Sequence, residues 1–114
     1  MAENKLADMS TEFAIQILKL TENIKGHHSL SNQLERCGTS IGANVAEAQR
    51  GQSKADFAAK MNIALKEANE TDYWLKLLYK TDYLTKEQYE SLNRDMQELL
   101  GILTAICRTS NANK

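Results

Sequence analysis

The chain has 114 residues and a mass of 12.8 kDa, which is the size of one domain around a single core and too short for two domains. Apolar residues make up 42% and charged residues 25%, so the chain is too hydrophobic to be disordered. Fourteen Lys and Arg against fifteen Asp and Glu give a net charge of −1, which argues against a strongly basic binder of nucleic acid.

Apolar residues recur at spacings of three and four in four stretches, and this period predicts four helices. The first helix is expected over residues 6–25, and Gly26 should end it. The second is expected over residues 30–49, with Ser29 as its N-cap residue. The predicted inward face of the first helix consists of Leu6, Met9, Phe13, Ile17, Leu20 and Ile24, with Ile15 and Leu18 widening it.

The third and fourth helices are marked by capping signals at their starts. Ser53 precedes a helix expected over residues 54–80. Thr85 followed by Gln88 has the spacing of a capping box and precedes a helix expected over residues 86–109. The fourth helix has the most regular apolar pattern in the chain, with spacings that alternate between three and four.

The four stretches predict one all-α domain over residues 1–114. No alternating strand pattern competes with the helices, and the sequence has no proline to interrupt them. Connections of about three to five residues place consecutive helices antiparallel, so we expect an up-down-up-down four-helix bundle. No segment approaches the roughly 20 apolar residues that span a bilayer, and the amino terminus has no signal-peptide pattern. The protein is therefore expected in the cytoplasm, with no membrane partner.

The second predicted helix carries two unusual flanks beside its apolar face. Two glycines inside a helix cost roughly 1 kcal/mol each relative to alanine, so close approach of another helix should offset them. That helix belongs either to the same bundle or to a neighbouring subunit, and the sequence leaves both interpretations open. The polar flank consists of Arg36, Ser40, Asn44 and Glu47. The small-residue flank consists of Gly38, Gly42 and Ala46.

Two segments of the sequence resemble a known family. The run RCGTSIGANVAEAQRGQSKADF over residues 36–57 resembles the signature of the four-helix-bundle proteins encoded in bacterial 23S rRNA intervening sequences. The run IALKEANETDYWLKLL over residues 63–78 resembles the third helix of the same family. The sequence departs from the family at Ala48, where many members have glycine, and at Lys66 and Glu67, where many have Gly-Ser.

The resemblance implies an antiparallel bundle that assembles as a homopentameric ring and has no established enzymatic activity. It also implies a fold related to the accessory proteins of diversity-generating retroelements, which associate with a reverse transcriptase and with nucleic acid. The family's polar signature falls on Arg36, Ser40, Asn44, Glu47 and Glu70. Because buried polar groups must be paired, we interpret this stripe as a structural network or subunit interface before a catalytic set.

The sequence predicts no catalytic, cofactor or metal site. His27 and His28 are neighbours in a turn without a second pair of ligands. Gly51 is isolated, so no glycine-rich phosphate loop is present, and no small-molecule substrate is expected. Cys37 and Cys107 fall on predicted core faces, where a reduced thiol is inert.

Two places could contact RNA. Aromatic and lysine residues alternate around the junction of the third and fourth helices, although acidic residues are mixed among them. Arg50 and Lys54 lie in the turn between the second and third helices and would form a basic rim in a ring. The leading hypothesis is a non-enzymatic homo-oligomeric bundle whose partner is RNA or an RNA-handling protein. The alternatives are an accessory subunit of a retroelement reverse transcriptase and a purely structural scaffold.

Overall fold

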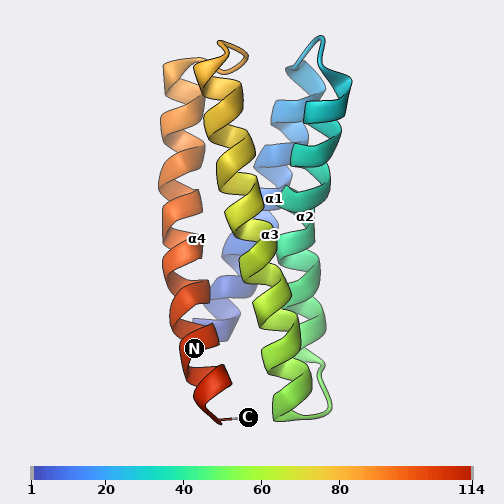
Figure 1. The fold of residues 1–114 in the computed structure, drawn as a ribbon, viewed down its shortest axis with the longest axis vertical. Coiled ribbons are helices and arrows are strands. Elements are labelled where there is room, and N and C mark those ends of the chain that lie inside the picture. Colours follow the sequence, from blue (N-terminus) through green and yellow to red (C-terminus); the bar gives the residue numbers. More distant parts are fainter. Residues whose placement is uncertain (1, 114) are drawn as a thin grey trace.

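The structure is a computed structural model that describes the backbone of residues 2–113 and the side chains of residues 5–112. It is an all-α bundle of four helices, and Figure 1 shows consecutive helices joined at alternate ends. The helices are α1 (Ala2–Asn23), α2 (His28–Gln49), α3 (Lys54–Lys80) and α4 (Lys86–Asn113). The bounds of α3 equal the predicted ones. Helix α1 begins four residues and ends two residues before its predicted bounds, α2 begins two residues early, and α4 continues four residues further.

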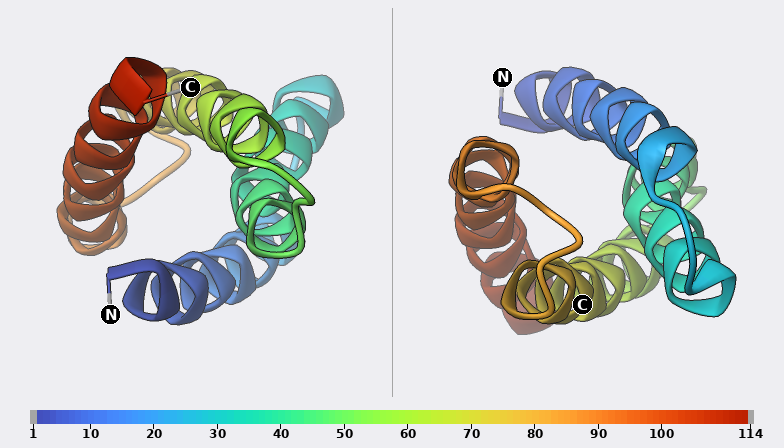
Figure 2. Two further views of the ribbon diagram at one scale, coloured as in Figure 1. Left: turned by 90° about the horizontal axis from the view of Figure 1, so that it is seen from below. Right: turned by 90° about the horizontal axis from the view of Figure 1, so that it is seen from above.

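Each helix lies beside two others around a common centre. Helix α2 packs against α1 and α3, and α4 packs against α3 and α1. In the described part of the chain, α1 does not approach α3 and α2 does not approach α4, so these pairs occupy opposite corners (Figure 2). The turn between α2 and α3 lies at the same end of the bundle as the start of α1 and the end of α4 (Figure 1).

The predicted apolar faces meet in one core. Burial of such side chains is the main source of stability in a bundle of this size. Ile15 and Leu18 were expected to widen the inner face of α1, and this expectation is wrong, because their side chains are 39% and 42% exposed. The largest fully buried side chains are Phe13, Leu6, Ile17, Leu34, Ile41, Met61, Leu75, Leu78, Met96, Leu99, Leu103 and Val45.

Two of the three predicted N-caps form. The hydroxyl of Ser53 accepts a hydrogen bond from the Asp56 amide at 3.0 Å. At the start of α4, the Thr85 amide donates to the Gln88 side chain at 2.8 Å, and the Gln88 amide donates to the Thr85 hydroxyl at 3.1 Å. This is a complete capping box.

The predicted Ser29 cap of α2 is wrong. The N-cap residue is His27, which adopts the left-handed conformation with φ 42° and makes no side-chain cap hydrogen bond. The helix therefore starts before Ser29. Edge-on contact of the His27 ring with Tyr83, at a centroid distance of 5.0 Å, holds this turn against the α3–α4 connection.

Candidate functional site

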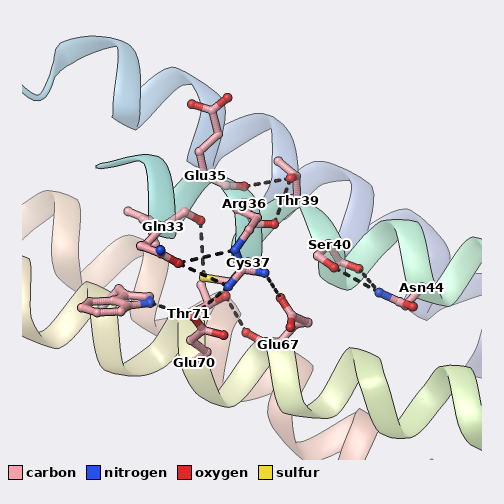
Figure 3. A network of polar contacts seen from close by, with 12 residues as sticks. Gln33, Glu35, Arg36, Cys37, Thr39, Ser40, Asn44, Glu67, Glu70 and Thr71 are labelled. Atoms are coloured by element: carbon pink, nitrogen blue, oxygen red, sulfur yellow. Dashed lines mark hydrogen bonds and ion pairs between the residues drawn. The ribbon is translucent and has the colours of Figure 1, made fainter. Parts of the chain in front are cut away.

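The guanidinium of Arg36, which α2 presents to α3, is the centre of a polar network (Figure 3). Its Nη1 lies 3.0 Å from the Glu67 carboxylate, and its Nη2 lies 2.8 Å from the Glu70 carboxylate. The Gln33 side-chain oxygen accepts from the same guanidinium at 3.4 Å. The indole of Trp74 donates to Glu70 at 3.2 Å, so one cation and two carboxylates join the two helices.

The two carboxylates differ in their surroundings. The Glu67 side chain is 11% exposed, whereas the Glu70 side chain is 31% exposed. The hydrogen bond from the Trp74 indole, followed by the bond from Arg36, lowers the pKa of Glu70. The hydrogen bond to Glu70 raises the pKa of Arg36. Both shifts favour the charged forms of Glu70 and Arg36, so these two groups form an ion pair at neutral pH.

The predicted polar stripe does not form one continuous network. Asn44 is 8% exposed, and its amide donates within α2 to the carbonyl and hydroxyl of Ser40 at 2.9 and 3.1 Å. The Glu47 side chain is 59% exposed and pairs with Lys60 of α3 at 3.3 Å. Only Arg36 and Glu70 among the predicted residues contact each other across helices.

Sequence reasoning missed Glu67 as a partner of Arg36. It was noted only as a departure from the family pattern, yet it lies three residues before Glu70, on the same face of α3. Trp74 was also missed as a hydrogen-bond donor, although it lies four residues after Glu70. A count of residues at spacings of three and four places both on the face of Glu70, but it does not give their partners.

The small-residue flank of α2 faces α1 within the same bundle. A Cβ atom at Gly38 would lie 3.0 Å from two side-chain carbons of Ile17, and a Cβ atom at Gly42 would lie 3.4 Å from the backbone oxygen of Ser10. These glycines therefore let α1 and α2 approach closely. Ala46, the third member of the flank, is exposed.

The two cysteines are buried and free. Burial raises the pKa of the Cys37 thiol and of the Cys107 thiol, so neither is a reactive thiolate. Among the residues that the structure describes, no three His, Cys, Asp or Glu side chains are grouped to hold a metal ion. No described helix is long and apolar enough to cross a membrane.

The aromatic residues near the α3–α4 junction divide into buried and exposed members. Tyr79 and Tyr89 stack on each other at 4.4 Å with an interplanar angle of 2°, and both pack on the core. Tyr83 and Trp74 also pack on the core. Only Tyr73 stands out, at 58% exposure, with its ring edge-on to Trp74. A stacking platform for several bases is therefore not presented there.

The turn between α2 and α3 presents cations to solvent. Arg50 caps the end of α2, Lys54 begins α3, and both side chains are exposed. Neither takes part in a salt bridge with the other described residues. The nearby carboxylate of Glu47 is instead bound by Lys60. The positive charge of this turn is therefore available to a partner.

The matching family model is that of the 23S rRNA-intervening sequence protein, and it covers residues 2–105. The chain belongs to this family. A crystal structure of a protein of unknown function from the S23 ribosomal protein family of Bacteroides thetaiotaomicron has 50% sequence identity and a TM-score of 0.88. The similarity covers 95% of this chain and 99% of that one. No curated protein matches the chain.

The residues matched by the 23S rRNA-intervening sequence protein family include the candidate surfaces described above. The matched range includes the Arg36 network, the glycines of α2 and the basic turn at Arg50. It ends before Cys107 and the last turns of α4. It also includes Glu67, the second carboxylate that Arg36 binds.

Proposed function

We propose that this member of the 23S rRNA-intervening sequence family is a non-enzymatic protein of the cytoplasm that assembles as a homopentameric ring. Its partner is RNA, bound weakly and through phosphate contacts. If the helices run along the ring axis, cyclic symmetry would bring the α2–α3 turns of all subunits to one rim. The helices would thus form the ring, and the α2–α3 turn would contact RNA.

The absence of catalysis is supported by how the polar groups are engaged. The Arg36 guanidinium is held by Glu67 and Glu70, and both thiols are buried with raised pKa values. A general base or nucleophile needs a free, suitably titrating group near a cavity. Interaction is the function that this arrangement supports best.

The observation that carries RNA contact is the unpaired positive charge of Arg50 and Lys54. One chain with net charge −1 attracts RNA little. In a ring of five chains, however, two such cations per chain give ten positive charges around one rim, and multivalent phosphate contacts add. The expected binding is strongly salt-dependent, because each phosphate contact releases counterions.

Titration of a labelled structured RNA at low salt tests the proposal. We expect the Arg50→Glu, Lys54→Glu double variant to bind at least tenfold more weakly than wild type, and wild-type binding to fall as salt rises. The matched control is Lys25→Glu, Lys86→Glu, which makes the same charge change with exposed lysines at the other end of the bundle. Equal affinities of wild type and the rim variant, or no binding by either, would contradict RNA contact at this turn.

A further inference from the structure

A hollow of about 170 Å³ lies between the start of α3 and the end of α4. It is lined by Lys54 and Phe57 of α3 and by Thr109 and Ser110 of α4. These two helices pack against each other, and the start of α3 and the end of α4 lie at the same end of the bundle as the α2–α3 turn (Figures 1 and 2). Because Lys54 belongs both to the basic turn and to the hollow, the two adjoin each other.

The first turn of α3 fixes the aromatic wall of the hollow. Phe57 lies three residues after Lys54, so both occupy the same face of the helix. The Phe57 amide donates to the Ser53 carbonyl at 3.0 Å, which holds Phe57 in this turn. Its ring packs against the core, remains partly accessible and lines the hollow. An aromatic ring is thus held at a fixed place beside the exposed side chain of Lys54.

The opposite wall carries two hydroxyl groups. Thr109 is exposed and Ser110 is half-buried, and neither side chain hydrogen-bonds another described residue. The next residue, Asn111, exchanges side-chain hydrogen bonds with Asn62 of α3 at 2.8 and 3.3 Å. This amide pair joins the end of α4 to α3, so it keeps the two hydroxyls opposite the Phe57 ring.

The size and lining of the hollow suit one flat ring with polar edges. Pockets for drug-sized ligands span about 300–1,000 Å³, so a hollow of about 170 Å³ has room only for a small group. Phe57 offers a stacking surface, and the hydroxyls of Thr109 and Ser110 can each donate and accept a hydrogen bond. An unpaired nucleobase has this combination of a flat face and polar edges.

The charge around the hollow favours a base that belongs to a nucleic acid strand. Among the described side chains that line it, Lys54 is the charged one and no carboxylate is present. The carboxylates of Glu47 and Asp56 line a different hollow, between α2 and α3, together with Arg50 and Lys60. A strand whose phosphate contacts Lys54 therefore brings its base to a site that is free of negative charge among these residues.

We propose that the hollow between α3 and α4 receives one unpaired base of the RNA that the basic turn contacts. This inference rests on the proposed function and names the class of RNA, which is one with unpaired nucleotides such as a hairpin loop. The base stacks on Phe57, and the hydroxyls of Thr109 and Ser110 bind its edge. A paired base does not enter, because its edge is occupied by its partner and its faces are stacked within the duplex.

Two labelled RNAs with equal numbers of phosphates test the inference, a hairpin with a single-stranded loop and a blunt duplex. At low salt, wild type should bind the hairpin more tightly than the duplex. Phe57→Leu keeps an apolar side chain but loses the ring, so it should weaken hairpin binding at least about fivefold and leave duplex binding unchanged. Phe57→Tyr is the matched control, because it retains a ring, and it should keep the preference for the hairpin.

A second variant tests the hollow from its other wall. Thr109→Leu removes a hydroxyl and places a larger side chain in the hollow from an exposed position, so it should also lower hairpin binding without disturbing the core. Thr104→Leu, at another exposed position of α4, is its matched control and should bind as wild type does. Melting followed by circular dichroism checks that each variant is folded, and Thr109→Leu decides the question if Phe57→Leu does not fold.

The outcomes separate this inference from the proposed function. If wild type binds neither RNA, RNA contact at the basic turn and the base site both fail. If Arg50→Glu, Lys54→Glu abolishes binding but wild type binds hairpin and duplex equally, the basic turn stands and the base site is wrong. The base site is also wrong if folded Phe57→Leu or Thr109→Leu weakens both RNAs alike or leaves both unchanged. Loss of the hairpin preference in the two variants, with both controls unaffected, supports it.

Discussion

Helices α2 and α4 occupy opposite corners of the bundle and are built differently. Helix α2 contacts α1 through Gly38 and Gly42, and it is joined to α3 through the Arg36 cluster. Helix α4 also carries a glycine, Gly101, but a Cβ atom there would have no neighbour within 4 Å. A glycine inside a helix therefore indicates close packing only where a neighbouring helix reaches it.

The polar contacts that the two helices make with their neighbours also differ. Between α1 and α4 the only salt bridge among described side chains joins Lys5 to Glu98 at 3.5 Å, and both side chains are more than half exposed. Hollows between these two helices are lined by polar and apolar residues of both. Exposed ion pairs contribute little to stability, so α1 and α4 are held together mainly by the apolar side chains packed between them. We expect α2 to tolerate less change than α4.

The largest expected effect comes from adding a side chain at the close contact of α2. Gly38→Leu should lower the free energy of unfolding by about 3 kcal/mol, because its Cβ alone would lie 3.0 Å from buried carbons of Ile17. Gly101→Leu on α4 is the matched control and should raise it by about 0.5–1 kcal/mol through helix propensity. Urea denaturation of both variants measures the difference, and equal effects would remove the contrast between the helices.

The ion cluster between α2 and α3 should make stability depend on pH. The pKa of Glu70 is lowered in the folded state, so its stabilising contribution is present above the ordinary glutamate value of 4.5 and is lost as pH falls through the folded value. Wild type should therefore lose more stability than Glu70→Gln between pH 7 and pH 3. Melting both proteins across this range checks the sign. Parallel pH profiles would mean that Glu70 is not held by Arg36 and Trp74 in solution.

The starts of the two helices give a smaller contrast. Thr85→Ala removes half of the capping box of α4 and should cost about 1 kcal/mol. Ser29→Ala, at the position predicted from sequence to cap α2, should change stability by less than about 0.5 kcal/mol, because His27 is the N-cap residue. Chemical denaturation of the pair is the measurement. A larger loss of stability from Ser29→Ala would indicate that Ser29, and not His27, is the N-cap residue of α2.

The smallest expected effect is at Glu47. The sequence placed it in a buried stripe, where loss of a charged partner would cost several kcal/mol, but its side chain is 59% exposed. Glu47→Ala should therefore cost well under 1 kcal/mol, as exposed ion pairs usually do. A double-mutant cycle with Lys60→Met measures the pair directly. A coupling energy above about 1 kcal/mol would contradict an exposed, weak pair.

The period of the apolar residues was sufficient to predict the four helices. It did not show which apolar residues at the edge of a helical face are buried. The spacing of three and four predicted all four helices, and most of the predicted inward positions are buried. Leu30, Phe57, Leu65 and Tyr89 are only partly buried and pack against the edge of the core. Ile15 and Leu18 were assigned to the core because they are apolar, although their angle from Ile17 places them outside it. Hydrophobicity alone cannot separate a core residue from an exposed apolar residue.

The candidate site was predicted less completely than the fold. Arg36 and Glu70 were named from the family pattern, and the structure brings them within 2.8 Å. Glu67 was not named, because which of two carboxylates on α3 reaches an arginine of α2 depends on the register between two helices. That register follows from packing, which local sequence spacing does not contain.

Native mass spectrometry of the wild-type protein at micromolar concentration measures directly how many chains assemble. Five chains of 12.8 kDa give a predicted mass of about 64 kDa. A single species at the mass of one chain would contradict the ring.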